Sequence, residues 1–569
     1  MSKKNKYPIV NITSLGGNNE DKIGGSCQVV EIETKDKTYR FMIDLGAKFV
    51  PYDTGYQQTF ADITDYFDKT DKNGNTTPAK KTLDGVFFTH GHQDHIGAIA
   101  EVANMGYEMP PMYASEFTGA KIKRLFYKNN LETPKIRPFN NGAKINLGDK
   151  IEIEAVSLPH SALEALGMHI LAKNEKGEDA IGIMHYGDFY TKDIPVGKTT
   201  DLSPYKDLIS RKLITHALMD VTSINTSNAP RVEFEEAVQN TLSVIKENKG
   251  KTIISPVISG SIENIAIDIE AARRLGKKIL LDGKSVREEY KDMYKSGYKD
   301  FKDVIFSGSK QAYLSEVPAN EQYIVCSGAF AQGMEEFEKN QGHENNIWMS
   351  SAAKMALGLS DTHEVSKNSL FLMRQREIPE ISGAYWPKMV NKLLAKGATV
   401  VSSGTESLKG KIKTKKMQDS GHIKTSELAE IYDDNITYMS VHGNKEQRSE
   451  ASKIMARMSP SGKSTYFFSN LQKLNLTPDG GVEFEGKAGV QTWIAVKREN
   501  SSEDPNNPNI CMKYIMINGN NEELYELCSV SENDKKEAKK QKQNTPVPQN
   551  PFEDAFKQAR AVKQRKGRR

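Results

Sequence analysis

The feature that most constrains this chain is the stretch VFFTHGHQDHIGA (86–98), where three histidines and an aspartate fall within six positions. The apolar run VFF is typical of a buried strand, so a strand delivers these polar residues to its end. His90 and His92 are two positions apart, so their imidazoles can project to the same side. Asp94 and His95 follow as the chain turns and can face a second position nearby. Imidazole and carboxylate together suit zinc or a similar divalent ion. The alternative is an accidental histidine-rich surface loop.

The surrounding pattern predicts an α/β chain whose polar residues collect at strand ends. Short apolar runs that end in a polar residue are typical of strands, and four of them are YRFMIDLGA (39–47), LDGVFFTH (83–90), IEIEAVSLPH (151–160) and IGIMHYGD (181–188). HIGAIAEVANMG (95–106) predicts a helix. Near residue 230 amphipathic helices begin to alternate with apolar strands, which predicts a parallel sheet with crossover helices.

Length and composition limit the class of protein. At 569 residues the chain is too long for one ordinary domain. No apolar stretch approaches the roughly 20 residues that cross a membrane, so we expect no membrane partner. The four cysteines stand far apart without a CxxC pair, which argues against a disulfide framework and a thiolate zinc site and favours a reducing, cytoplasmic location.

The end of the chain has a different composition. Beyond about residue 530, its Lys, Gln, Asn and Pro content predicts disorder. Residues 531–569 contain twelve lysines and arginines against five acidic residues, whereas the net charge of the whole chain is only +4. The remainder is therefore mildly acidic, and the tail is the largest basic patch that the sequence shows.

The motif HxHxDH is the signature of the metallo-β-lactamase superfamily, and the chain resembles that superfamily. Three further family positions are filled in order at strand ends: Asp44 in MIDLGA, His160 in LPHSALEALG and Asp188 in HYGDFY. The resemblance implies an αββα sandwich. Other histidines lack this placement: we expect His169 and His185 to be packed or solvent-facing, and we assign no role to His216, His343 and His363.

Three later motifs resemble those of the β-CASP nucleases, whose extra α/β domain is inserted into the sandwich. They are an acidic residue at a strand end, Asp220 in ALMDVTS, and two histidines, His422 in SGHIKTSE and His442 in YMSVHGNKEQ. Over roughly residues 8–500 the chain resembles the ribonuclease J family, departing from it at HSALE (160–164) and VHGN (441–444). We therefore predict that residues 1–222 form the first part of the sandwich and that residues 223–385 form the β-CASP insertion. Residues 386–529 would form the second part of the sandwich, and residues 530–569 would form a basic disordered tail.

The resemblance also implies a ligand set for two divalent ions, zinc or alternatively manganese. His90, His92 and His160 would hold the first, Asp94, His95 and His442 the second, and Asp188 would bridge them. Asp94, Asp188 and His422 are the implied catalytic residues. Ser420, Gly421 and His422 would bind the substrate, with backbone amides cradling a 5′ end, and Asp44 and Asp220 complete the motifs structurally.

The implied activity is metal-dependent hydrolysis of RNA to 5′-phosphate products, as a 5′-to-3′ exonuclease, an endonuclease or both. The expected partner is single-stranded RNA with a 5′-monophosphate, and the expected assembly is a homodimer or homotetramer. A histidine at the position of His442 accompanies RNA substrates in this family. The alternatives are a DNA nuclease of the same family, a catalytically inactive RNA-binding subunit, and a small-molecule hydrolase, which would need no insertion.

Overall fold

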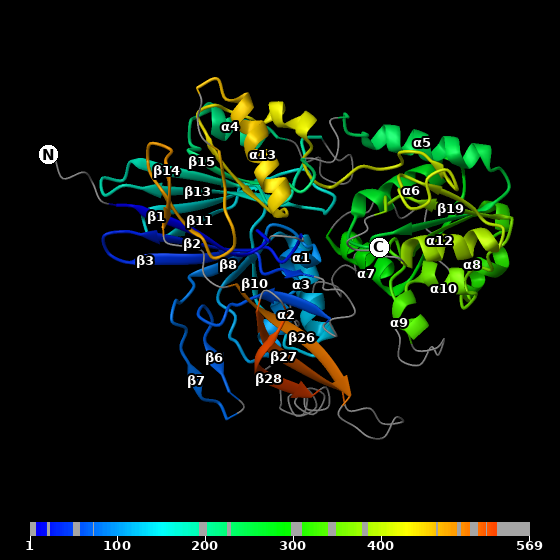
Figure 1. Cartoon of the computed structure of the whole chain (residues 1–569), viewed down its shortest axis with the longest axis horizontal. Coiled ribbons are helices and arrows are strands. Elements are labelled where there is room, and N and C mark those ends of the chain that lie inside the picture. Colours follow the sequence, from blue (N-terminus) through cyan, green and yellow to red (C-terminus); the bar gives the residue numbers. More distant parts are fainter. Residues whose placement is uncertain are drawn as a thin grey trace, which may run out of the picture.

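The computed structural model describes residues 7–19, 23–48, 57–71, 73–192, 202–224, 229–296, 310–339, 349–377, 385–461, 465–485, 491–500, 510–518 and 521–531. Two large sheets lie face to face on one side of the molecule, and a separate α/β unit lies on the other (Figure 1).

The first sheet of the sandwich has eight strands. Their spatial order is β10 (Ile136–Pro138), β9 (Met112–Ala114), β8 (Gly85–Phe87), β3 (Thr38–Ile43), β2 (Cys27–Glu33), β1 (Ile9–Gly16), β24 (Lys473–Leu476) and β25 (Val482–Glu485). The last two strands return from far along the chain, because β24 pairs antiparallel with β1. The first sheet is therefore formed by two separate parts of the chain, residues 9–138 and residues 473–485.

The second sheet of the sandwich has seven strands. Their order is β11 (Lys144–Leu147), β12 (Ile151–Ser157), β13 (Leu166–Lys173), β14 (Asp179–His185), β15 (His216–Asp220), β22 (Thr437–Val441) and β23 (Tyr466–Phe467). In β12 the alternation IEIEAV buries Ile151, Ile153 and Ala155 while both glutamates stay partly exposed. These apolar residues meet Ile12 and Phe41 of the first sheet in one core.

Helices cover the outer faces of both sheets, which confirms the predicted αββα sandwich. The first sheet carries α1 (Gln93–Ile96), α2 (Ile99–Asn104) and α3 (Glu116–Lys128), and the second carries α4 (Ser203–Ser210) and α13 (Lys445–Met458). The predicted helix 95–106 is therefore two short helices separated at Gly97 and Ala98. The break lets the Ala98 amide donate to the Leu45 carbonyl oxygen, 3.1 Å away.

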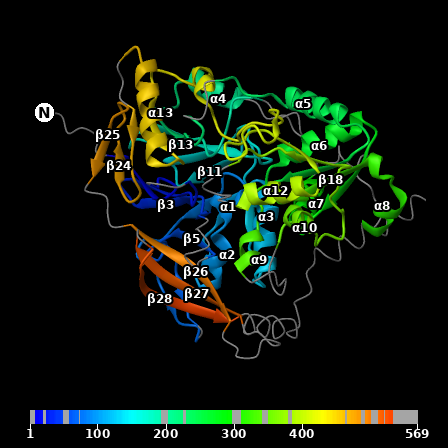
Figure 2. The same cartoon turned by 45° about the vertical axis from the view of Figure 1, so that its right-hand side comes forward.

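The inserted unit is a six-stranded parallel sheet with helices on both faces (Figure 2). Its strand order is β17 (Lys278–Asp282), β18 (Gln322–Ser327), β16 (Thr252–Val257), β19 (Ser369–Met373), β20 (Thr399–Ser402) and β21 (Lys413–Thr414). One face packs on α5 (Phe234–Glu247), α6 (Ile262–Arg274) and α7 (Lys284–Lys295), and the other on α8 (Lys310–Glu316), α10 (Ser351–Leu357) and α12 (Tyr385–Ala395). Its described residues also include the short helices η3 (Ala319–Glu321) and α9 (Met334–Lys339).

The predicted return to the sandwich at residue 386 is wrong. Helix α12 and strand β20 belong to the inserted sheet, since β20 pairs with β19. The chain rejoins the sandwich only between β21 and β22, through the short helix η4 (Thr425–Glu430). A helix followed by a strand has the same sequence pattern whether the strand is the last of one parallel sheet or the first of another. The pattern alone therefore could not show to which sheet α12 and β20 belong.

A five-stranded sheet packs beneath the α1–α2 layer, with order β28 (Glu523–Ser531), β27 (Ile510–Asn518), β26 (Thr492–Asn500), β5 (Gln58–Ala61) and β4 (Ala47–Lys48). A hairpin of β6 (Lys69–Thr70) and β7 (Thr76–Thr77) lies apart from the larger sheets (Figure 1). The predicted tail boundary at 530 falls inside β28, and residues from 532 on lie outside the described part of the chain. No helix in the described ranges is long and apolar enough to span a bilayer.

Candidate metal centre

The candidate site lies where the carboxyl ends of several strands meet at one edge of the sandwich. In the first sheet β3 and β8 run parallel and end just before Asp44 and His90. In the second sheet β14, β15 and β22 run parallel, and Asp188, Asp220 and His442 stand at or just after their ends. The topology thus collects residues that are far apart in sequence.

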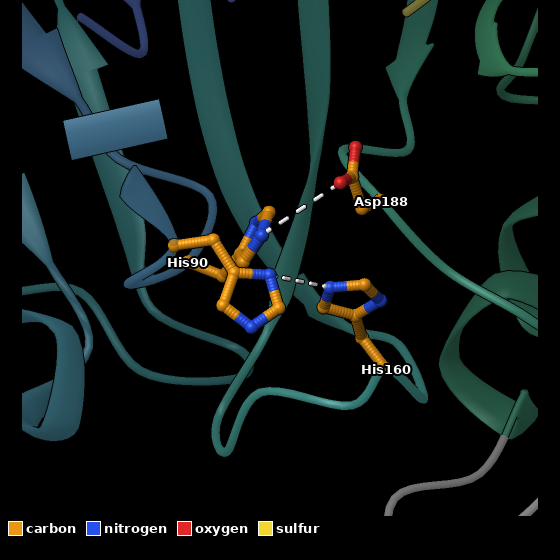
Figure 3. Close-up of side chains that lie close together, drawn as sticks. His90, His160 and Asp188 are labelled. Carbon is orange, nitrogen blue, oxygen red and sulfur yellow. Dashed lines mark hydrogen bonds and ion pairs between the residues drawn. The ribbon is translucent and has the colours of Figure 1, made fainter. Parts of the chain in front are cut away.

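The first donor group consists of His90, His92, His160 and Asp188, whose ligand atoms all lie within 4.8 Å of one another. His160 Nε2 lies 3.1 Å from His92 Nδ1, and His90 Nε2 lies 3.8 Å from Asp188 Oδ2. Figure 3 shows the rings of His90 and His160 and the Asp188 carboxylate gathered around a common point. These are the residues that the sequence predicted for one ion.

The second donor group consists of Asp94, His95, Asp188 and His442, also within 4.8 Å. His95 Nε2 lies 3.2 Å from both Asp188 Oδ2 and His442 Nε2, and His442 Nε2 lies 3.3 Å from Asp94 Oδ2. Asp188 belongs to both groups, as a bridging ligand would.

In four histidines of the donor groups, the ring nitrogen that does not face the other donors contacts a neighbouring oxygen atom. They are His92, His95, His160 and His442. His95 Nδ1 lies 2.7 Å from Asp44 Oδ2, and His442 Nδ1 lies 2.8 Å from Thr222 Oγ1. His160 Nδ1 lies 2.6 Å from the Gly421 carbonyl oxygen, and His92 Nε2 lies 3.1 Å from that of Gly260. Such contacts fix the orientation and tautomer of a metal-binding imidazole.

Asp44 and Thr89 hold the base of the site. Asp44 has a φ of 61°, an uncommon conformation for a non-glycine residue, and accepts hydrogen bonds from the Thr89 amide (2.8 Å) and hydroxyl. The Thr89 hydroxyl also lies 3.1 Å from His90 Nδ1. Sequence reasoning missed Thr89, although its position directly before the motif was a usable signal.

The donor groups fit divalent ions. His90 Nε2 and Asp188 Oδ1 are buried and have no hydrogen-bond partner among the described residues. Burial, with repulsion from neighbouring histidines, holds the pKa of His90 and His160 well below the usual range, so both are neutral donors. Burial also opposes a charged His95, but Asp188, Asp44 and Asp94 outweigh it and raise its pKa to about 10. This excess of carboxylate around His95 is what a bound cation would neutralise.

His422 stands at the rim of the donor groups. Its Nδ1 lies 2.7 Å from Asp220 Oδ2, and 21% of its side chain is exposed. Its ring centre lies 5.7 Å from that of His160 and 5.6 Å from that of His442. Asp188, Asp220, His422 and His442 form a third candidate donor group, but Asp220 and His422 Nδ1 already satisfy each other.

The loop that carries His422 pairs two of its backbone amides, those of Ser420 and His422, within the protein. The Ser420 amide donates to Asp419 Oδ1 at 2.9 Å, and the His422 amide donates to Ser420 Oγ at 3.3 Å. Gly421 turns its carbonyl oxygen to His160. These two amides are therefore not available to bind a 5′ end in this arrangement, and the binding of a 5′ end at Ser420 and Gly421 stays a prediction.

The remaining histidines lie outside the donor groups. His169 and His216 are buried in β13 and β15, where each contacts a backbone carbonyl oxygen, and His363 contacts Ser369 in the inserted unit. His185 is buried beneath the site, and the Gly187 amide donates to its Nδ1. His343 lies outside the described residues.

Known proteins resemble this chain in sequence and fold. Residues 65–195 match a protein-family model described as a β-lactamase superfamily domain. Ribonuclease J of Sinorhizobium meliloti is 28% identical over 212 residues, which are 37% of this chain and 35% of that protein. Ribonuclease J 2 of Staphylococcus aureus (strain NCTC 8325 / PS 47) is 25% identical over 354 residues, which are 61% of this chain and 57% of that protein. The matches thus span less than two thirds of either relative.

Among solved structures, a protein of unknown function from Enterococcus faecalis V583 aligns with 82% of this chain and 100% of its own. The TM-score is 0.51 at 14% identity, which supports the fold alone. The sandwich, with HxHxDH at one edge, has the architecture of the metallo-β-lactamase fold. In sequence, the chain is similar to the ribonuclease J proteins of these two bacteria.

Proposed function

We propose that this protein is a metal-dependent nuclease that hydrolyses RNA phosphodiester bonds, acting from the 5′ end, internally or both. The observation that carries the proposal is the pair of donor groups that share Asp188, with the His422–Asp220 pair beside them. We further propose zinc as the ion, with manganese as the alternative. The seven ligands would be His90, His92 and His160 for one ion, Asp94, His95 and His442 for the other, and Asp188 for both.

Two divalent ions held there would supply positive charge to the phosphate and lower the pKa of a nearby water. Asp94, which is 29% exposed, and the buried Asp188 would help to hold the ions, and their carboxylates could orient such a water and accept its proton. The water oxygen then bonds to phosphorus while the bond to the 3′ oxygen breaks. The downstream fragment keeps a 5′-phosphate.

His422 is suited to protonate the departing 3′ oxygen. Burial disfavours its charged form, but Asp220 and Asp188 outweigh burial and raise its pKa. Its Nδ1 is held by Asp220, so Nε2 is the nitrogen left to face a substrate. A protonated imidazole in that position acts as a general acid and yields a 3′-hydroxyl.

The proposed substrate is single-stranded RNA with a 5′-monophosphate, by the resemblance and the similarity to ribonuclease J. The inactive-subunit alternative has less support, because all seven proposed ligand positions carry donor side chains that converge. A reducing, cytoplasmic location remains part of the proposal, because the four cysteines stand far apart in the sequence without a CxxC pair. So does a homodimer or homotetramer, which light scattering of the full chain would test.

The direct test is cleavage of end-labelled single-stranded RNA by the purified full chain, with and without a chelator. We expect cleavage that the chelator abolishes and that added Zn²⁺ or Mn²⁺ restores, with 5′-phosphate on the products. Asp94→Ala, prepared in parallel, controls for a contaminating nuclease. Hydrolysis of a lactone or thioester with intact RNA would instead support a small-molecule hydrolase.

A further inference from the structure

A buried ion pair joins the two crossings between the sandwich and the inserted unit. Arg231 lies on the outgoing crossing, between β15 and α5, and Glu427 lies on the returning crossing, in η4. Arg231 Nε lies 2.9 Å from Glu427 Oε1, and Arg231 Nη2 lies 2.9 Å from Oε2. Both side chains are almost fully buried. This two-pronged geometry needs a guanidinium and is not available to an ammonium.

The same guanidinium holds the loop that carries His422. Arg231 Nη1 donates to the Ser420 carbonyl oxygen, and Nη2 donates to the His422 carbonyl oxygen at 2.7 Å. The carbonyl oxygen between them, that of Gly421, lies 2.6 Å from His160 Nδ1. Three successive carbonyl groups are therefore bound alternately by Arg231 and by a proposed metal ligand.

Glu427 and Arg231 also contact the segment that follows Asp188. Glu427 Oε1 accepts hydrogen bonds from the Thr191 amide at 3.3 Å and hydroxyl at 3.0 Å. The guanidinium carbon of Arg231 lies 4.1 Å from the centre of the Tyr190 ring. The ion pair thus connects the loop of the bridging aspartate to the loop of His422.

The loop has little room to move on its own. A Cβ placed on Gly421 would come within 2.6 Å of Ser161 Oγ and 3.1 Å of His160 Cε1, so the loop already packs directly on the ligand. Any shift of Ser420 or His422 would therefore be transmitted to the His160 ring.

We propose that Arg231, paired with Glu427, is a positioning residue that sets both the His160 ligand and His422 through the backbone of residues 420–422. It is not among the proposed ligands and acts through that backbone. The role in cleavage rests on the proposed function, whereas the role in metal binding does not. Outer contacts of this kind typically change metal affinity or activity by about 10- to 100-fold.

The test compares Arg231→Lys with Arg374→Lys in the full-length protein. Arg374 forms an equally buried pair with Asp268 inside the inserted unit and makes no hydrogen bond to residues 419–422 among the described contacts. Both variants keep the positive charge but lose the paired hydrogen bonds that a guanidinium makes to a carboxylate. The midpoint temperature of thermal unfolding should therefore fall in each variant. Zn²⁺ affinity is measured by competition with a chromophoric chelator, in the absence of RNA.

We expect Arg231→Lys to weaken binding of one Zn²⁺ by about tenfold or more, while Arg374→Lys changes it less than twofold. Glu427→Gln, which keeps the shape and loses the charge, should show a smaller effect of the same kind. With RNA, Arg231→Lys should lower kcat at least tenfold with little change in KM. Equal Zn²⁺ affinity for Arg231→Lys, Arg374→Lys and the parent overturns the proposal, whether or not the protein cleaves RNA. Normal Zn²⁺ binding by the parent without RNA cleavage overturns the proposed function alone.

Discussion

His422 Nδ1 and Asp220 Oδ2 lie 2.7 Å apart, although 202 positions separate the two residues in the chain. Asp220 ends β15 in the sandwich, and His422 arrives after the whole inserted unit. The contact therefore forms only when the returning segment is docked against the sandwich. It places a histidine beside the donor groups without making it part of either proposed ligand set.

Replacing His422 should separate chemistry from metal binding. We expect His422→Ala to retain its metal and to lose cleavage by roughly 100-fold or more, because the proposed general acid is removed. Zinc content and single-turnover cleavage of RNA are the measurements. His363→Ala, a change at a histidine of the inserted unit, is the control and should cleave normally. Normal cleavage by His422→Ala would show that this residue is not the proton donor.

Removing a proposed ligand should remove metal. The parent chain should hold up to two zinc-like ions, and His90→Ala or Asp94→Ala should lose both metal and activity, since each takes a donor from a buried group. Elemental analysis after gel filtration measures the metal content, with His363→Ala as the control. A metal-free sample that remained fully active would exclude the two-ion centre.

The 5′ end of the substrate should affect the rate. Single-stranded RNA with a 5′-monophosphate should be degraded faster than the same RNA with a 5′-triphosphate and faster than matched DNA. The expectation follows from the resemblance to the ribonuclease J family, in which a histidine at the position of His442 accompanies RNA substrates. Initial rates on three matched substrates measure it. Equal rates on DNA would favour the DNA nuclease alternative.

The contact between α3 and α7 should contribute to stability in a pH-dependent way. Buried Glu289 lies 2.6 Å from Lys121 Nζ and 3.0 Å from Arg124 Nη2. Burial alone would raise the pKa of Glu289, but the two cations outweigh it and lower the pKa. Glu289→Gln leaves Lys121 without its buried partner and Arg124 with Asp292 alone, which should cost about 3 kcal/mol of unfolding free energy at neutral pH.

A neighbouring pair on the same helices gives the control. Glu288 pairs with the more exposed Lys128 at 2.6 Å, so Glu288→Gln should cost less than about 1 kcal/mol. Because the folded pKa of Glu289 is lowered, its contribution is complete above about pH 4.3 and declines as the pH falls toward the folded value. Chemical unfolding at several pH values measures both effects. Equal losses in the two variants would contradict the assignment of a buried pair.

The basic tail should increase general attraction to RNA. Residues 532–569 contain twelve lysines and arginines against five acidic residues, and cations that contact phosphates release counterions. Deleting 532–569, which keeps β28 intact, should weaken RNA binding and flatten its salt dependence while cleavage of a short bound oligonucleotide stays nearly unchanged. Binding titrations at several salt concentrations measure this. An unchanged salt slope would leave the tail as a spacer or as a docking site for another partner.

The ligands could be predicted from the sequence because they follow strands at recognisable spacing. His90, His92, Asp94 and His95 are nearly consecutive, and the others end apolar runs. Their orienting contacts could not be predicted. The Gly260 carbonyl oxygen that faces His92 is 168 positions away, and a backbone carbonyl has no sequence signature. The Arg231–Glu427 pair spans 196 positions and looks in sequence like two ordinary charged residues.

The position of the inserted unit between two neighbouring strands has a consequence for biosynthesis. β15 and β22 pair in parallel, with His216 opposite Thr437, so the ribosome must translate the whole insertion before the second sheet can close. Closing so long a loop from an unfolded chain is entropically unfavourable, and prior folding of the insertion shortens the disordered span that remains. Its high contact order makes this closure a late step. In the proposed ligand sets His442 belongs to the second ion alone, so binding of that ion would require a chain translated through residue 442.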